Sequence, residues 1–325
     1  MLKVGIVGVG QFGQNHARIL NESTLCDFVG LYDKNKKRAE EISSKLGTKS
    51  FKDFESLLNE IDVLFNVVTT ISHFDLAERA LKKGIHVFIE KPITETLQQA
   101  KELIELADEK NLKIQVGHIE RFNPVIIEIE DKVKNPIFME CHRIAPFTPR
   151  GTDIPVVLEL MIHDIDLILS FMESKVKYIS ASGAGVMTKS IDIANARIEF
   201  EDGAVANITA SRISMKRSRQ LRIFQKDGYF SIDFQDKSVK HIKKSKNLYK
   251  VLPKLMMGKF ENIDTKDVVD IVEVNASDRE KDALTIEIES FIHAVESDIN
   301  PVVDGRAGTR ALEVALEIVN KINRN

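Results

Sequence analysis

The sequence has few cysteines, little net charge and no long apolar run, and each shortage excludes a class of protein. Cys26 and Cys141 are the only cysteines, too few for a disulfide framework or a thiolate zinc site. The formal net charge of −3 gives no overall attraction to nucleic acid or to an anionic membrane. No stretch approaches the roughly 20 apolar residues of a membrane span. The first residues also lack the basic start and cleavage site of a signal peptide, so a cytoplasmic protein is expected.

What is present is typical of a globular protein with more than one domain. Apolar residues make up 43% and charged residues 29% of the 325 residues, which predicts about two domains. The first third alternates short apolar runs with amphipathic helical stretches. The apolar runs are residues 3–9, 27–32, 62–68, 85–89 and 112–116, and the helical stretches are 12–22, 35–46, 73–83 and 94–110. This rhythm predicts a doubly wound parallel sheet of the Rossmann type.

The pattern changes after about residue 117. Helices are expected near 123–132 and 156–171, and strands at 136–145, 175–184, 191–200, 204–211, 219–225 and 229–234. Two more helices, near 278–296 and 305–323, close the chain. The series of strands predicts an α+β domain with a large, open, mostly antiparallel sheet. We therefore expect a Rossmann domain at 1–119 and a second, α+β domain at 120–325, with the open sheet joining copies into a homodimer or homotetramer. The motifs described next predict that the first domain binds NAD(P) and the second binds the substrate.

A glycine loop follows the first apolar run. Gly8, Gly10 and Gly13 fit G-x-G-x-x-G between a strand and a helix, which is the context that makes this motif informative. The glycines allow a tight turn, close approach to a pyrophosphate and close helix packing. Gln11 and Phe12 lie in the same loop, where the start of the helix faces the phosphates.

The second strand ends in Asp33, 25 residues after Gly8. A carboxylate there accepts hydrogen bonds from the adenosine ribose hydroxyls and repels a 2′-phosphate. This favours NAD. Lys34 and Arg38 follow closely and would support NADP, which stays as the alternative.

Polar residues also follow three other strands of the first domain. Ligands bind beyond the carboxyl ends of the strands in an open α/β sheet. The residues at these ends are Thr69, Thr70, His73, Glu90, Lys91, Pro92 and His118. A lysine that is partly desolvated beside a cofactor can have its pKa tuned toward catalysis.

The stretch VVLELMIHDIDLILSF, residues 156–171, is apolar nearly all round, as expected for a buried helix. Glu159 and His163 are spaced i, i+4 and share a face. A metal site built from Glu159, His163 and Asp164 is one reading, although this spacing is no recognised ligand pattern. The more specific interpretation is that His163 exchanges a proton with a substrate.

With these residues in hand, the chain resembles the glucose-fructose oxidoreductase / inositol dehydrogenase (Gfo/Idh/MocA) family over essentially its whole length. The resemblance rests on GVGQFGQNH, HFDLAERALKKGIHVFIEKPIT, RFNP and ELMIHDIDL. It implies that Lys91 lies beside the nicotinamide and the reacting hydroxyl, that the bond to Pro92 is cis, and that His163 is the catalytic acid/base. Glu159 stands where many members have aspartate, which leaves its role in the catalytic set open. Ser72 replaces the usual asparagine before His73.

Within the family, GHIERFNP and ELMIHDIDLI most resemble the UDP-N-acetylglucosamine 3-dehydrogenases. The resemblance implies an NAD-dependent oxidoreductase acting on a secondary hydroxyl of a UDP-sugar. His118, Arg121 and Asn123, in the first of these segments, are expected on the substrate side. Arginine suits bidentate phosphate binding. The candidates for the diphosphate are Arg121, Arg143, Arg150 and Arg212.

Two other functions stay open. The first is a dehydrogenase of a free sugar or polyol such as inositol, and the second is an NAD-binding regulator without turnover. Eight lysines and no acid occur between Lys237 and Lys259. We expect a solvated hairpin and loop there, with an anion-facing or oligomer-facing loop as the alternative. Nucleic-acid binding is not expected, because the segment has few aromatic residues for stacking.

Overall fold

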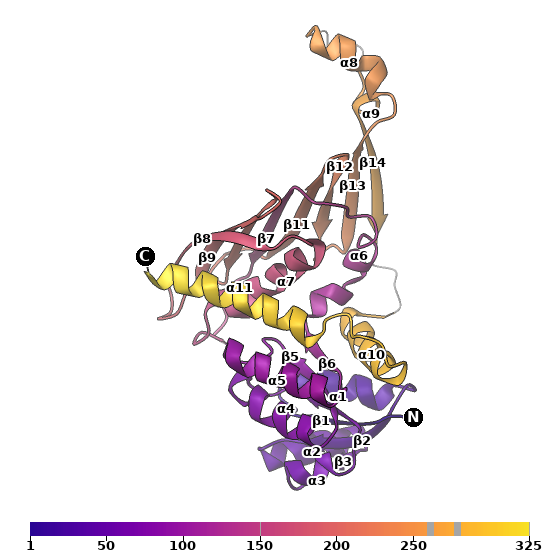
Figure 1. Cartoon of the computed structure of the whole chain (residues 1–325), viewed down its shortest axis with the longest axis vertical. Coiled ribbons are helices and arrows are strands. Elements are labelled where there is room, and N and C mark those ends of the chain that lie inside the picture. Colours follow the sequence, from indigo (N-terminus) through magenta and orange to yellow (C-terminus); the bar gives the residue numbers. More distant parts are fainter. Residues whose placement is uncertain (150, 259–262, 276–280, 325) are drawn as a thin grey trace. The chain divides into compact units, whose positions relative to one another are not determined.

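The computed structural model describes residues 1–149, 151–258, 263–275 and 281–324. The chain forms two compact units (Figure 1). Unit 1 consists of residues 1–122 and 281–314, and unit 2 consists of residues 123–280 and 315–325. Each unit is built around its own sheet.

Unit 1 contains a six-stranded, all-parallel sheet with the strand order β3-β2-β1-β4-β5-β6 (Figure 1). The order reverses between β1 and β4, which is the arrangement of a doubly wound Rossmann fold. The predicted fold class of the first third is therefore confirmed. The strands are β1 (Lys3–Val7), β2 (Asp27–Tyr32), β3 (Lys49–Ser50), β4 (Val63–Asn66), β5 (His86–Glu90) and β6 (Ile114–Gly117).

The helices between these strands begin and end at residues suited to those positions. Asn35 caps the start of α2, and Gly47, with a φ of 67°, ends it. Thr96 and Gln99 form a capping box at the start of α5. The helices are α1 (Gly13–Glu22), α2 (Lys36–Leu46), α3 (Phe54–Leu58), η1 (Thr70–Ser72), α4 (His73–Lys82), α5 (Leu97–Glu109) and η2 (Ile119–Phe122).

The end of the chain returns to complete unit 1. Helix α10 (Ala283–Glu296) packs Ile288, Phe291 and Ile292 into the same apolar core as β1 and β4. The Phe291 ring lies 5.9 Å from Phe65 and 6.1 Å from Phe88 between ring centroids. The division expected at residues 119 and 120 thus differs from the compact units, because α10 and the first half of α11 (Gly305–Arg324) belong with the first sheet.

Unit 2 contains an eight-stranded sheet with the order β14-β13-β12-β11-β7-β10-β9-β8. Every neighbouring pair is antiparallel except β7 and β10, as the sequence predicted for a mostly antiparallel sheet. The strands are β7 (Phe138–Ile144), β8 (Val176–Ala184), β9 (Ile193–Phe200), β10 (Val205–Ser211), β11 (Ser218–Gln225), β12 (Gly228–Asp233), β13 (Ser238–Lys244) and β14 (Val269–Asn275).

The helices of unit 2 differ from expectation in three places. Helix α6 covers only Pro124–Ile127, because turns replace the rest of the helix expected at 123–132. The helix expected at 156–171 begins as the π-helical turn η3 (Val157–Met161) and continues as α7 (Ile162–Phe171). The lysine-rich segment forms β13 and α8 (Leu248–Met256), followed by α9 (Thr265–Val268). Among all described helices, none is long and apolar enough to cross a bilayer.

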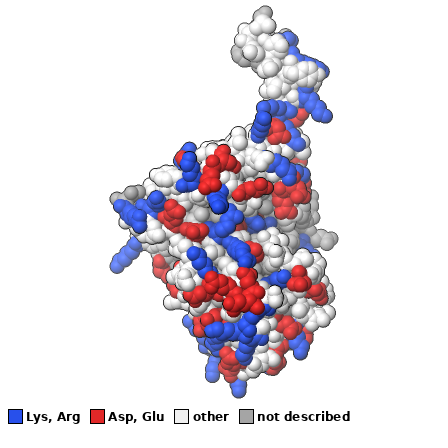
Figure 2. Space-filling view, in the orientation of Figure 1, with Lys and Arg blue, Asp and Glu red and all other residues white. Residues whose placement is uncertain are grey.

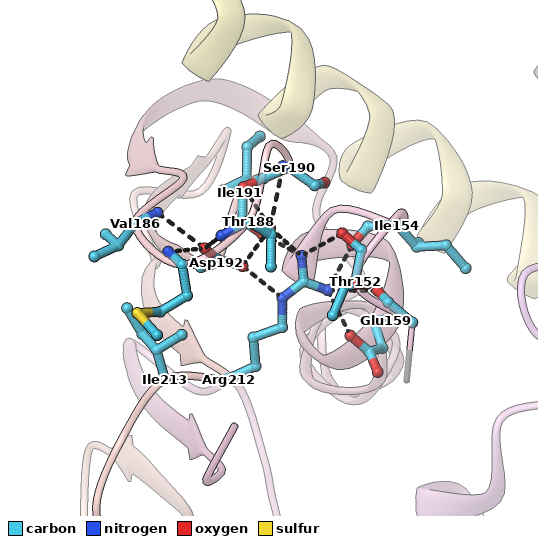
Figure 3. A network of polar contacts seen from close by, with 12 residues as sticks. Thr152, Ile154, Glu159, Val186, Thr188, Ser190, Ile191, Asp192, Arg212 and Ile213 are labelled. Carbon is cyan, nitrogen blue, oxygen red and sulfur yellow. Dashed lines mark hydrogen bonds and ion pairs between the residues drawn. The ribbon is translucent and has the colours of Figure 1, made fainter. Parts of the chain in front are cut away.

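A buried arginine joins three segments of unit 2 (Figure 3). Arg212 is 4% exposed. Its Nε donates to Asp192 Oδ1 at 2.9 Å, and its Nη1 donates to Glu159 Oε2 at 2.9 Å. The same Nη1 donates to the carbonyl oxygens of Gly151 at 2.6 Å and Ile154 at 2.7 Å. One guanidinium therefore fixes the loop before η3, the turn η3 itself and the start of β9.

Asp192 holds the loop before β9 in the same network. Its Oδ2 accepts hydrogen bonds from the backbone N–H groups of Val186, Met187 and Thr188 at 2.7–2.9 Å. Its Oδ1 accepts from the Thr188 hydroxyl at 2.7 Å. Burial alone would raise the pKa of Asp192, but hydrogen bonds from Thr188 and Arg212 outweigh burial and hold this pKa well below its usual range. Asp192 is therefore an anion throughout the neutral range.

Removing the Asp192 charge should strongly destabilise the protein. We expect Asp192→Asn to lower the free energy of unfolding by about 3–5 kcal/mol, because it leaves the buried Arg212 guanidinium with one anionic partner instead of two. Urea denaturation at neutral pH measures the change. As the control, Glu22→Gln breaks the exposed Arg18–Glu22 pair and should cost no more than about 0.5 kcal/mol.

The same variant gives a pH test of the pair. A folded-state pKa below the unfolded one means that Asp192 stabilises the protein above the unfolded pKa of about 3.9. This stabilisation is lost as the pH falls through the lower, folded-state pKa. The difference between wild type and Asp192→Asn should therefore be full at pH 6 and shrink below about pH 4. Equal stability of the two proteins at pH 6 would contradict the importance of the pair.

Candidate functional site

The glycine loop of unit 1 has the geometry that a dinucleotide needs. Gly8 has a φ of +87°, and its N–H donates to the Tyr32 carbonyl at 2.9 Å. A Cβ added at Gly13 would lie 1.9 Å from the Gly8 carbonyl oxygen, so only glycine lets α1 start this close to β1. A Cβ at Gly10 would meet nothing nearer than Arg38 Nη1 at 4.0 Å, so the space beside Gly10 is open.

Asp33 lies at the end of β2 beside this loop. Its Oδ2 accepts from the Val9 N–H at 2.9 Å, and its Oδ1 accepts from the Asn35 N–H at 2.8 Å. Arg38 Nη1 is 3.7 Å from Oδ2 and is half-exposed. The two backbone contacts aim the carboxylate along the edge of the sheet, where it can accept hydrogen bonds from a ribose.

The other predicted residues of unit 1 meet at the same edge. Val7 pairs with Asn66, Asn66 with Ile89, and Glu90 with Gly117, so all these parallel strands end side by side. The residues that follow them are Thr69, which is exposed, the half-buried Thr70, Glu90 and Lys91, and the buried His118. Gln11 and Phe12 are exposed on the neighbouring loop, with Phe12 58% exposed.

The residues around Lys91 are held by two buried histidines. Glu90 Oε1 lies 3.3 Å from His16 Nε2, and Glu90 Oε2 accepts from the Lys91 N–H at 3.1 Å. Burial alone would raise the pKa of Glu90, but His16 and the Lys91 charge lower it. Glu90 is therefore an anion that holds the backbone at Lys91. Sequence reasoning missed His16, although it lies one helical turn after Gly13 on the face that packs toward the sheet.

His73 fixes the other side of this turn. The ring is 1% exposed, and its Nδ1 lies 2.9 Å from the Pro92 carbonyl oxygen. The other ring nitrogen, Nε2, lies 3.3 Å from the Val68 carbonyl oxygen, so both ring nitrogens face acceptors. Burial lowers the pKa of His73. The peptide bond between Lys91 and Pro92 is cis, as the family resemblance implied. His73, which the sequence assigned to the cofactor, thus supports the turn that carries Lys91.

Arg121 and Asn123 lie after β6. Arg121 is half-buried, and its Nη2 donates to the Val302 carbonyl at 3.3 Å. Asn123 caps α6 by accepting a hydrogen bond from the Val125 N–H at 3.3 Å. Arg121 is thus a partly accessible cation, while the Asn123 side chain has a structural task.

In unit 2, His163 is the half-buried residue in an otherwise buried part of α7. Glu159 lies in the π-helical turn one turn earlier, and its carboxylate is 27% exposed and engaged by Arg212 (Figure 3). This turn commonly marks functional sites in helices. The pair Glu159 and His163 therefore consists of an arginine-bound carboxylate and a half-buried imidazole.

Two arginines expected to face a substrate are instead buried in ion pairs. Arg143 is 3% exposed and binds Asp164 through Nε at 2.9 Å and Nη2 at 2.8 Å. Arg212 is held as described above. The sequence could not reveal this, because their acidic partners lie about 20 residues away. Arg150 lies outside the described residues.

The ion pairs of Arg143 and Arg212 argue against the metal site that the sequence left open. Asp164 and Glu159 are both engaged by arginine, which opposes binding of a cation by these carboxylates. Among the described residues, no group of three or more His, Cys, Asp or Glu side chains is placed to hold a metal ion.

The residues of unit 1 fit NAD. The open space beside Gly10 and the close approach at Gly13 suit the pyrophosphate, and the carboxylate of Asp33 suits the ribose. When bound, the nicotinamide would supply the hydride chemistry. Gly8, Gly10, Gly13 and Asp33 would hold the adenosine diphosphate part.

Comparison with known proteins agrees with this geometry. Residues 2–118 match the model of an oxidoreductase family with an NAD-binding Rossmann fold, and residues 147–231 match a GFO/IDH/MocA C-terminal domain. A UDP-N-acetylglucosamine 3-dehydrogenase from Acidithiobacillus ferrooxidans is 33% identical over 98% of this chain and 96% of its own length. A scyllo-inositol 2-dehydrogenase (NAD(+)) from Bacillus subtilis is 26% identical over 66% of this chain and 68% of its own.

Solved structures give the same result for the fold. A structure of the Acidithiobacillus ferrooxidans enzyme matches with a TM-score of 0.89 at 32% identity, and the match covers 99% of this chain and 98% of that one. A dehydrogenase structure from Clostridium difficile matches with a TM-score of 0.82 at 22% identity over 99% of both chains, which supports the fold alone. With both family models matched in order and a relative aligned over almost its full length, the chain belongs to the Gfo/Idh/MocA family of NAD-binding oxidoreductases.

Proposed function

We propose that the protein is an NAD-dependent dehydrogenase that oxidises the secondary hydroxyl at C3 of UDP-N-acetylglucosamine. The observation that carries this proposal is the match to a UDP-N-acetylglucosamine 3-dehydrogenase over 98% of the chain at 33% identity. The inositol dehydrogenases match a smaller part of the chain, 66% in one case at 26% identity. A free polyol is therefore the second candidate substrate.

The proposal assigns the proton chemistry to two residues. His163 accepts the proton of the substrate hydroxyl, because it is the half-buried imidazole in an otherwise buried helix. Lys91 stabilises the negative charge that develops on the oxygen. Its backbone is fixed on one side by Glu90 and on the other by the Pro92 carbonyl that His73 binds. Such positioning is what general acid–base catalysis requires.

Glu159 is assigned a supporting role in place of direct catalysis. Its carboxylate accepts a hydrogen bond from Arg212 Nη1 at 2.9 Å. It also lies in the π-helical turn that leads directly into the helix of His163. Glu159 and Arg212 therefore set the start of that helix and the direction of His163. Arg121 and Arg150 remain the candidates for the substrate diphosphate, since Arg143 and Arg212 are committed to buried pairs.

The substrate assignment predicts a clear order of activities. Initial rates of NADH formation with NAD should be highest with UDP-N-acetylglucosamine. N-acetylglucosamine and scyllo-inositol should give a kcat/KM at least about 100-fold lower, because a site that binds a diphosphate gains that energy only from a nucleotide substrate. A higher kcat/KM with scyllo-inositol would overturn the substrate proposal and favour the polyol alternative.

The catalytic assignment predicts that substituting Lys91 or His163 lowers the turnover rate without weakening cofactor binding. Lys91→Met and His163→Ala should each lower kcat by about 10²–10⁴-fold. The affinity for NADH, measured by fluorescence titration, should change less than about threefold, because the glycine loop and Asp33 are untouched.

Matched controls are available on the surface of unit 1. Lys101→Met and His293→Ala remove the same groups at exposed positions and should leave kcat unchanged. Normal turnover by Lys91→Met or His163→Ala would refute the assigned role of that residue. Retained NADH binding without any turnover by the wild type would instead indicate a cofactor-binding regulator.

We also propose that the enzyme is a homo-oligomer joined through the sheet of unit 2. In β9 the side chains alternate between buried and mostly exposed positions, so one face of the sheet covers the core and the other faces outward. The outward face carries an open hollow of about 470 Å³ whose lining includes Glu140, Ser182, Asn195 and Arg197. A broad polar face of this kind suits an interface between copies.

Sedimentation velocity tests the oligomer. The wild type should sediment as a dimer or larger at micromolar concentration. Ser182→Lys, which adds charge and bulk to the outward face of β8, should shift the protein toward monomer. Ser44→Lys, at an exposed position of α2, should have no effect. A wild-type protein that stays monomeric would refute the interface.

A further inference from the structure

A basic pocket in unit 2 is used by none of the residues assigned above. Three segments line it: the chain after α6, the turn between β11 and β12, and the end of β13. It is an open hollow of about 730 Å³, within the size range of sites for small molecules. We call it the lysine pocket. Part of the lysine-rich segment noted in the sequence forms one of its walls.

The lysine pocket carries a strong excess of positive charge. Each segment contributes lysine: Lys132 and Lys134 from the first, Lys226 from the second, and Lys243 and Lys244 from the third. Lys132 also pairs with Glu128, and the Lys244 Nζ donates to the Lys226 carbonyl at 3.2 Å.

Asp227 is the one acidic residue among those that line the pocket. On the face of the molecule drawn in Figure 2, by comparison, acidic and basic side chains are interspersed. A concave surface lined by one sign of charge concentrates ions of the opposite sign.

A buried histidine in the pocket wall gives a second, independent indication of a ligand. His241 is 8% exposed, and its Nε2 has no hydrogen-bond partner among the described residues. Its ring packs against Phe230, with 3.9 Å between centroids and the ring planes tilted by 31°. Burial, and then the charge of Lys243, lower the pKa of His241, so the ring is neutral in the free protein. Buried polar atoms without partners are rare and call for an explanation.

The pocket is also preformed. Gln225 Oε1 accepts from the Lys134 N–H at 3.0 Å, and Gln225 Nε2 donates to Asp227 Oδ1 at 2.9 Å. The Lys244 N–H donates to the Asp227 carbonyl at 3.2 Å. These bonds tie the three segments together before any ligand arrives, which lowers the entropic cost of binding. One of them also engages Asp227 Oδ1.

We propose that the lysine pocket binds a small molecule that carries a diphosphate or a longer phosphate chain. Five ammonium groups exceed what a single carboxylate would need, whereas a diphosphate brings several negative oxygens at once. The neutral imidazole of His241 adds a hydrogen-bonding group beside them. This site is additional to the proposed dehydrogenase site and does not depend on it, because no residue assigned to catalysis or to NAD lines it.

Pyrophosphate is the probe that tests the site. The full-length protein is titrated with pyrophosphate by isothermal calorimetry, with NAD present in excess so that the glycine loop is occupied. The His241 imidazole resonances are followed in parallel by NMR. We expect saturable binding and a shift of the His241 resonances with the same Kd. The double variant Lys134→Gln/Lys243→Gln should bind at least tenfold more weakly and keep its dehydrogenase activity.

A matched control separates the pocket from general charge. Lys250→Gln/Lys254→Gln removes the same charge from α8, which does not line the pocket, and should bind pyrophosphate like the wild type. Equal weakening in both double variants, or an unshifted His241, would overturn the proposal. Vesicles containing phosphatidylglycerol test a lipid source of phosphate: binding to them that the pocket variant abolishes would identify a membrane surface and overturn the small-molecule proposal, whereas no binding would agree with it.

Discussion

The strands β1, β4, β5 and β6 run in one direction, and the site residues of unit 1 depend on that shared direction. A parallel strand cannot turn back at once, so each one ends at the same edge and releases its next residues there. Gly8 follows β1, and Lys91 follows β5. The backbone hydrogen bonds of the buried sheet thereby bring residues that are far apart in the sequence to the same edge.

In unit 2, the histidine proposed to act as the acid/base lies half-buried in a mostly buried helix. Arg212 gives this helix a fixed start by binding Glu159 and the carbonyl oxygens of Gly151 and Ile154. A charge inside a protein is tolerated only with well-placed partners, and Asp192 supplies the second carboxylate. The network therefore ties the start of the helix that carries His163 to the loop before β9.

The sequence predicted most of the fold, because periodic apolar patterns report which faces are buried. Apart from the two-residue β3, which was not predicted, the strands of both sheets up to β12, the glycine loop and the cis bond before Pro92 agree with the structure. Long-range pairing was not predictable. Arg143 and Arg212 look like exposed cations until Asp164 and Asp192 are seen beside them, and the partnership of His16 with Glu90 likewise requires the folded sheet.

The return of α10 to the first sheet has a consequence for how the chain is made. A ribosome delivers the six strands of unit 1 first, yet Phe291 and its neighbours complete their core. During synthesis, part of the apolar face of the first sheet therefore stays uncovered while the residues of unit 2 that precede α10 are made. Unit 2 in turn includes residues 315–325, so neither unit is complete until the last helix has been made.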